Sequence, residues 1–268
     1  MENTENKEVK AEVESAVDTN DTVITDTYTK EIDVPSNGYL GGPSKITIRA
    51  MRTSEEKILN SENNSNYLNK LCKACTIKPK NLDWKTLTPN DYQFILFQLR
   101  ELTYGPIYKQ PIVCPYCGRS QDAEINIASF EYELLGKDVE SKLFVELPIS
   151  KAQVHLRLLS QDEIDKIDNE AEELARKGLV SDASTHAIDK KFAAMVDTVS
   201  GEEFKTDQEK FAFVQNMHLA DFNAIRNAVG NIRYGLNNVA KVTCQNSLCG
   251  QEVEVLGTVC PEFFHPTI

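Results

Sequence analysis

Two pairs of cysteines, far apart in the chain, are the residues whose types and spacing best suit a chemical role. Cys114 and Cys117 are spaced C-x2-C, whereas Cys244 and Cys249 are spaced C-x4-C, and a glycine follows each pair. Zn(II) takes four thiolates in a tetrahedron, and glycine permits the tight turn that folds backbone N–H groups around the sulfurs. The four cysteines therefore predict one structural Zn(II) ion shared by two knuckles.

Such a closed site leaves the metal no open position for water or substrate, so we interpret it as structural rather than catalytic. Apolar residues alternate behind each pair, at Ala123, Ile125 and Ile127 and again at Val253 and Val255. This alternation predicts that each knuckle opens onto a strand. Two such hairpins facing one metal would make a zinc ribbon.

Thiol chemistry is a competing interpretation of the first pair. Cys114-Pro115-Tyr116-Cys117 also has the spacing of the active site of glutaredoxin-like oxidoreductases. That mechanism requires the first cysteine at a helix N-terminus, whereas a strand pattern follows here. The second pair has no place in it, so we rank it below a shared metal. Buried reduced thiols remain a third interpretation.

A further pair, Cys72 and Cys75, ends a helical pattern, lacks a following glycine and has no counterpart in the second half of the chain. We interpret it as two small residues partly buried at a helix end. If the pair did bind a second metal, Cys260 and His265 would be the obvious completing ligands.

The rest of the chain lacks a recognisable catalytic constellation. Its histidines, His155, His186, His218 and His265, are scattered and form no H-E-x-x-H motif. G-x-S-x-G, phosphate-loop and G-x-G-x-x-G motifs are also missing, and the glycine-rich turn at residues 38–42 is expected to join two strands. We predict a protein that is not an enzyme and has no small-molecule substrate.

The elements that must position the cysteines follow an internal repeat. At an offset of 130 residues, several residues align without a gap, namely Asp91 with Asp221, Tyr92 with Phe222, Ile95 with Ile225, Tyr104 with Tyr234, Gly105 with Gly235 and Cys114 with Cys244. Upstream, two strand patterns (residues 46–49 and 154–157) each precede a helix start resembling a capping box, Thr53–Glu56 and Ser160–Glu163. We interpret the chain as a duplication.

This repeat sets the expected organisation. Residues 1–30 should form a disordered acidic arm, because residues 1–35 carry ten acidic side chains and three lysines. Residues 31–142 should form the first repeat with the first knuckle, and residues 143–268 the second repeat with the second knuckle. The predicted fold class is α+β, with two hairpin-and-helix units joined by a zinc ribbon.

Composition narrows the possible partners. The 268 residues include 41 acidic and 29 basic side chains, a net charge of -12, which disfavours coating nucleic acid or anionic lipid. No run of 18 apolar residues and no secretory signal pattern is present, so we expect no membrane association and a reducing compartment. Protein partners are the remaining class.

Several short motifs together resemble T4-like bacteriophage baseplate hub proteins. They are Val34–Gly38, Lys45–Arg49, Thr53–Glu56, Leu87–Asp91, Tyr104-Gly105, the first knuckle and Phe263-Phe264-His265-Pro266. The resemblance implies a non-enzymatic component or assembly factor of a contractile-tail baseplate, whose partners are other phage baseplate or tail proteins. It also implies assembly in the bacterial host cytoplasm and a place in the virion. The acidic arm is then a segment that could order against a neighbouring subunit.

Two other functions stay open. One is a zinc-ribbon adaptor for nucleic acid, because ribbons often present basic loops beside the metal. Arg119 alone makes a poor basic patch, so we do not expect nucleic acid as the partner. The other is the thiol oxidoreductase.

Overall fold

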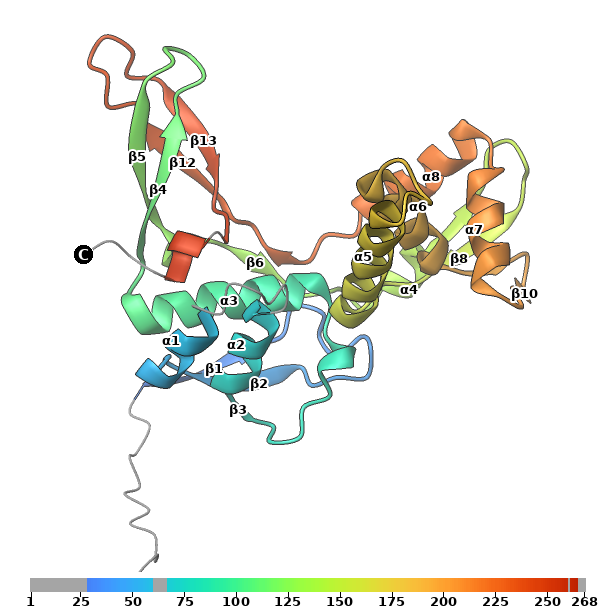
Figure 1. The fold of residues 1–268 in the computed structure, drawn as a ribbon, viewed down its shortest axis with the longest axis horizontal. Coiled ribbons are helices and arrows are strands. Elements are labelled where there is room, and N and C mark those ends of the chain that lie inside the picture. The colour runs from blue at the N-terminus through green and yellow to red at the C-terminus, as the bar shows by residue number, and fades with distance from the viewer. Residues whose placement is uncertain (1–27, 60–66, 260, 265–268) are drawn as a thin grey trace, which may run out of the picture.

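The computed structural model describes residues 28–59, 67–259 and 261–264, and it has an α+β fold in which two lobes are joined by paired connectors (Figure 1). The expected arm, residues 1–30, lies outside the described residues except for its last three, of which Thr29 and Lys30 begin the first strand.

The first lobe packs helices on a small antiparallel sheet of order β1-β2-β3. Its elements are β1 (Thr29–Asp33), β2 (Lys45–Arg49), α1 (Thr53–Leu59), α2 (Tyr67–Cys75), β3 (Thr76–Lys78), the 3-10 turn η1 (Trp84–Thr86) and α3 (Pro89–Tyr104). The glycine-rich turn joins β1 to β2, as expected. A capping box between Thr88 and Asp91 starts α3, and Gly105, at a φ of 84°, ends it.

The second lobe contains a four-stranded antiparallel sheet of order β10-β9-β8-β7 with helices packed around it (Figure 1). Its elements are α4 (Val139–Lys142), β7 (Phe144–Glu146), β8 (Gln153–Leu156), α5 (Gln161–Arg176), α6 (Ala183–Met195), β9 (Val196–Val199), β10 (Glu202–Glu203), α7 (Asp207–Gln215) and α8 (Leu219–Gly230). Ser160 and Glu163 form the predicted capping box at the start of α5.

Two hairpins and two connectors complete the fold. They comprise β4 (Ile107–Val113), β5 (Ser120–Asn126), η2 (Ile127–Ser129), β6 (Tyr132–Glu133), β11 (Gly235–Leu236), β12 (Val239–Thr243), β13 (Glu252–Leu256) and η3 (Pro261–Phe264). The hairpins β4-β5 and β12-β13 project together from the first lobe (Figure 1). Between the lobes, β6 pairs with β11, so the outgoing and returning connectors lie side by side.

The two lobes share a common order of elements, to which the second lobe adds α4 before β7, and β10 and α7 between β9 and α8. In each, a hairpin (β1-β2 or β7-β8) leads into a helix, a later helix precedes a third strand that pairs with the second, and another helix leads toward a cysteine hairpin. The register shifts after Thr47 in β2 and after His155 in β8.

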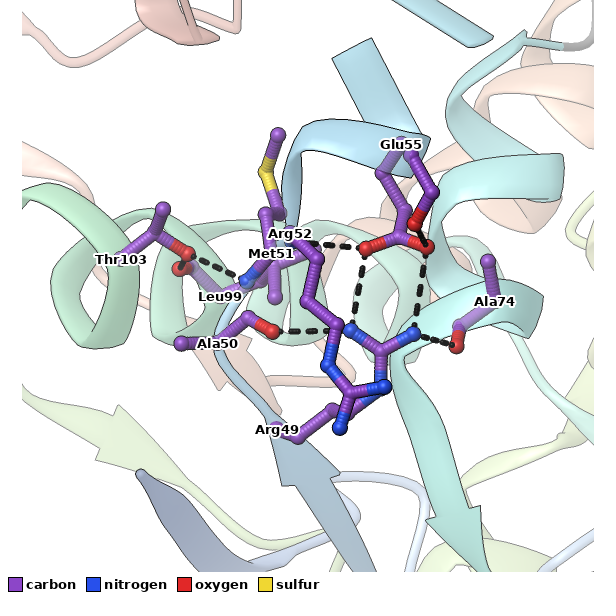
Figure 2. Close-up of polar contacts among 9 residues, drawn as sticks. Arg49, Ala50, Met51, Arg52, Glu55, Ala74, Leu99 and Thr103 are labelled. Carbon is purple, nitrogen blue, oxygen red and sulfur yellow. Dashed lines mark hydrogen bonds and ion pairs between the residues drawn. The ribbon is translucent and has the colours of Figure 1, made fainter. Parts of the chain in front are cut away.

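An arginine–glutamate pair occupies the same place in both lobes. Arg49 at the end of β2 binds both carboxylate oxygens of Glu55 at 3.0 and 3.2 Å, and the backbone N–H of Arg52 donates to the same carboxylate at 2.7 Å (Figure 2). In the second lobe Arg157 binds both oxygens of Glu163 at 3.2 and 2.6 Å. The predicted cap at Thr53 is wrong by one residue, because α1 already begins at Thr53 and Glu55 reaches back to Arg52.

The described residues form two hydrophobic cores, and these divide the chain differently from the sequence repeat. One core holds buried residues of the first lobe and both hairpins, including Val253, Val255, Phe263 and Phe264. The other runs from Leu135 to Ile225 within the second lobe. The second hairpin and the C-terminal phenylalanines therefore belong to the core of the first lobe, in which the ring centre of Phe263 lies 4.9 Å from that of Phe97 on α3.

Candidate metal centre

The first cysteine pair sits in the tight turn between β4 and β5. The backbone N–H of Cys114 donates to Arg119 O at 2.9 Å, and that of Gly118 donates to Cys114 O at 2.9 Å. Gly118 has a φ of 71°, a conformation that a residue with a Cβ rarely adopts. The turn is thus the one that the sequence predicts after a second cysteine.

The second pair sits in the longer turn between β12 and β13 and has a similar closure. The N–H of Cys244 donates to Gln251 O at 2.8 Å, and that of Gly250, at a φ of 56°, donates to Asn246 O at 2.9 Å. No helix begins at either pair, so neither has the helix N-terminus that thiol oxidoreductase chemistry requires.

The structure brings all four predicted sulfurs together. Every Sγ lies within 4.8 Å of the other three, with Cys114 to Cys249 at 3.9 Å and Cys117 to Cys244 at 3.7 Å. Four sulfurs around a tetrahedral ion at about 2.3 Å would lie roughly 3.8 Å apart, so the spacing fits a metal. It is much longer than a disulfide bond of about 2.05 Å, and all four cysteines are free thiols.

Backbone dipoles and crowding set the charge of this cluster. The backbone N–H of Arg119 lowers the pKa of Cys117 to about 7. The N–H of Asn246 lowers the pKa of Cys244, but burial and hydrogen bonds with the neighbouring thiols outweigh it and raise that pKa to about 12. The pKa of Cys249 is also raised, so these two thiols resist losing their protons without a cation beside them, and a divalent ion would supply that charge.

Glutamine side chains hold the two hairpins together, one next to the sulfurs and one farther along the strands. Gln121 of β5 accepts from the N–H of Gln245 at 2.8 Å and donates to Thr243 O at 3.4 Å. Gln110 of β4 donates to Leu256 O at 3.2 Å. Neither glutamine is predicted from the sequence, because no local signal distinguishes it from an ordinary polar residue on a strand.

Comparison with known proteins agrees with the resemblance. The model of the family described as T4 bacteriophage base plate protein matches residues 25–265. The chain belongs to this family. No curated protein and no solved structure matches it.

The third cysteine pair of this baseplate protein has a different environment. Cys72 and Cys75 lie in the last turn of α2 and are both buried, as expected for core residues. Burial raises the pKa of both thiols, that of Cys75 to about 12, so they remain protonated at neutral pH. Cys260 and His265, the further ligands considered for them, lie outside the described residues. Within the described part of the chain, the four knuckle cysteines are the metal-ligating cluster found.

The described histidines of the baseplate protein lie apart from this cluster. His155 on β8 lies between Asp197, 3.0 Å from Nδ1, and Glu140, 3.4 Å from Nε2, and its ring stacks on Phe144. His186 on α6 packs edge-on against Phe211. None of the described helices is long and apolar enough to cross a membrane.

Proposed function

We propose that this chain is a non-enzymatic structural component, or an assembly factor, of a contractile-tail bacteriophage baseplate, and that one Zn(II) bound by Cys114, Cys117, Cys244 and Cys249 stabilises it. Its partners are other baseplate or tail proteins, with the hub as its location. It is assembled in the bacterial host cytoplasm and resides in the virion. The family match over residues 25–265 supports the baseplate role.

The observation that carries the metal assignment is the convergence of four sulfurs from two hairpins that are far apart in the chain. Sulfurs this close repel as thiolates, and a closed site of four cysteines is typical of structural zinc. Binding of zinc to such a site is worth roughly 10 kcal/mol or more, enough to offset closure of the long intervening loop. The two hairpins then form a zinc ribbon.

We also infer that the two halves derive from a duplicated unit. The matched arginine–glutamate pairs support this, as does a second correspondence between aligned aspartates. Asp91 accepts from the backbone N–H of Ser36 at 2.7 Å, and Asp221 accepts from the N–H of Ile149 at 2.7 Å. Each of these N–H donors lies just after a strand and a proline, which strengthens the correspondence. In such a duplication, each ancestral copy would have contributed one knuckle to the shared ion.

Metal analysis tests the zinc assignment directly. Purified full-length protein should contain about one zinc per chain, and Cys114→Ser or Cys244→Ser should lose nearly all of it. Cys72→Ala, which removes a buried thiol outside the cluster, is the matched control and should keep the metal. Wild-type protein that lacks stoichiometric zinc after purification in zinc-containing medium would refute the assignment.

The baseplate role needs a separate test, because metal binding does not report on assembly. The chain should be detected in purified virions by mass spectrometry, and phage that cannot produce it should accumulate incomplete baseplates. Detection only in assembly intermediates would favour the assembly factor over the component. Complete, infectious particles formed without the chain would contradict both.

A further inference from the structure

Five lysines that are close together in the sequence of the first lobe, which we call the basic strip, form no ion pair among the described residues. Residues 70–85 carry five lysines and one aspartate, a local net charge of +4 in a chain of net charge -12. The basic strip comprises Lys70 and Lys73 on α2, Lys78 on β3, and Lys80 and Lys85 beyond it. All five are exposed, so their charges face solvent.

These lysines differ from others in the same lobe. Lys30 pairs with Glu101 at 3.2 Å, and Lys45 lies 3.6 Å from both Glu31 and Asp33. Within the part of the chain that the structure describes, no member of the basic strip forms an ion pair. An uncompensated group of like charges raises the local potential and attracts an anionic partner.

Part of the basic strip borders a groove between the two lobes. The groove has a volume of about 450 Å³, and Lys70, Lys73, Lys85, Trp84 and Tyr92 line its first-lobe wall. The ammonium group of Lys73 lies 5.9 Å from the centre of the Trp84 ring. An extended segment bound there would meet cationic side chains and an aromatic surface.

The opposite wall, on α5, contains two carboxylates that are already engaged. Asp162 pairs with Lys166 at 2.7 Å. Asp165 accepts from Asn69 and from Gln161, each at 2.7 Å. Their charge is therefore partly compensated. The first-lobe wall adds a third carboxylate, Asp83, which accepts from the backbone N–H of Lys85 at 3.1 Å and forms no ion pair among the described residues, so the three lysines leave the unpaired charges of the groove net positive.

The chain carries a segment of complementary charge. Residues 1–27 include eight acidic side chains and two lysines, a net charge of -6. The described chain begins next to the same sheet, because the N–H of Ala50, just after β2, donates to Tyr28 O at 2.9 Å, and β3 is the neighbour of β2. With strands about 4.8 Å apart, Tyr28 lies within roughly 10 Å of β3, and 27 residues can extend up to ~90 Å.

We propose that, in the free protein, the acidic segment of residues 1–27 docks in its own chain on the basic strip and in the groove beside Trp84. Covalent continuity favours this contact over binding to a second molecule, because the tether raises the local concentration of the segment. The contact should weaken with salt, as expected for exposed charges. It is independent of the metal centre and of the duplication.

Zero-length crosslinking of the full-length protein tests this docking. A carbodiimide joins a carboxylate to a lysine amine by an amide bond, with water taken up by the carbodiimide as it becomes a urea. Peptide mapping should find residues 1–27 joined mainly to Lys70, Lys73 and Lys85, with a yield at least fivefold lower in 0.5 M salt. When isotope-labelled and unlabelled protein are mixed, the links should join peptides of the same chain and not a labelled peptide to an unlabelled one.

Matched charge variants provide the control. The double variant Lys73→Glu/Lys85→Glu should reduce links to the remaining lysines of the basic strip at least fivefold. The control variant Lys137→Glu/Lys205→Glu changes the net charge by the same amount at exposed lysines elsewhere. It should leave the yield of links to the basic strip unchanged. Far-UV circular dichroism should be the same for both.

The single tryptophan of the chain gives a second readout. When the acidic residues of the segment are replaced by Asn or Gln, quenching of Trp84 by acrylamide, a neutral quencher, should rise about twofold. Links spread evenly over all lysines, links mainly between chains, or unchanged Trp84 quenching would overturn the proposal. Displacement of the segment by an oligonucleotide at submicromolar concentration would overturn it in favour of a nucleic-acid surface.

Discussion

The two lobes place the same arginine–glutamate pair in different surroundings. In the first lobe Arg49 and Glu55 have side chains only 10% and 7% exposed, and the guanidinium also donates to Ala50 O and Ala74 O (Figure 2). In the second lobe Arg157 and Glu163 are 32% and 35% exposed. The more exposed pair has the shorter contact, so burial and contact distance rank the two pairs in opposite orders.

The difference indicates which lobe depends more on its polar interior. Burial raises the pKa of Glu55, but hydrogen bonds from Arg49, Arg52 and Ser54 outweigh it and lower that pKa to about 2. The buried pair links β2, α1 and α2, so losing one partner would leave an uncompensated charge inside the lobe. Around Arg157, water can replace a lost partner.

The largest expected effect concerns whether each lobe folds alone. A fragment of residues 31–135 lacks Phe263, whose ring centre lies 4.9 Å from those of Phe97 and Tyr108, and whose carbonyl accepts from Arg100. Removing a buried phenylalanine side chain costs about 3–5 kcal/mol, a large part of the stability of a domain. We expect no cooperative melting by circular dichroism. A fragment of residues 134–236, which contains every buried residue of the second core, should melt cooperatively.

Deleting the second lobe tests whether the first lobe and both hairpins fold together without it. Glu133 pairs with Gly235 across β6 and β11, so a short glycine-serine linker can replace the second lobe without separating the hairpins. The resulting protein should melt cooperatively and bind one zinc. If it fails to fold while residues 31–135 fold well, the assignment of the C-terminal hairpin to the first core is wrong.

The next effect is the cost of breaking each arginine–glutamate pair. Arg49→Ala should lower the free energy of unfolding by about 3–5 kcal/mol, because Glu55 is left buried and unpaired. Arg157→Ala should lower it by about 1 kcal/mol or less, because Glu163 stays partly solvated. Urea titrations of both variants measure the difference. Equal losses would mean that burial does not distinguish the two pairs.

Much of this architecture could be predicted because its signals are local. Cysteine spacing and the following glycines encode the knuckle turns, and hydroxyl–carboxylate spacing locates the start of α5. The same pattern at Thr53 places the start of α1 one residue too late. The offset alignment even pairs Asp91 with Asp221. Which carboxylate binds Arg49, and which backbone N–H groups the aspartates hold, depends on how the chain folds back on itself.

Which residues share a core also depends on how the chain folds back on itself, so it could not be predicted from the sequence. Sequence periodicity identifies Val253 and Val255 as inward-facing, but it does not show that they pack with the first lobe rather than with their own half. The basic strip is visible as a run of lysines, yet its significance depends on the absence of ion pairs among the described residues. Long-range packing decides both, and a single sequence carries little record of it.

The smallest expected effect separates the two aligned aspartates by pH. Burial raises the pKa of Asp91 more than its hydrogen bonds from Thr88 and Ser36 lower it. For Asp221, burial acts in the same direction, but hydrogen bonds from the N–H groups of Ile149 and Ser150 prevail and lower the pKa. Carbon-detected NMR titration should therefore place Asp91 above, and Asp221 below, the ordinary value of about 3.9.

The opposite shifts give opposite contributions to stability in acid. The contribution of Asp221 is present above pH ~3.9 and is lost as the pH falls through its lower folded-state pKa. That of Asp91 is present below pH ~3.9 and is lost as the pH rises through its higher folded-state pKa. Asp221→Asn should therefore destabilise the protein more at pH 7 than at pH 3, whereas the penalty of Asp91→Asn should be smaller at pH 7 than at pH 3. Identical pH profiles for the two variants would show that the aligned aspartates have equivalent environments.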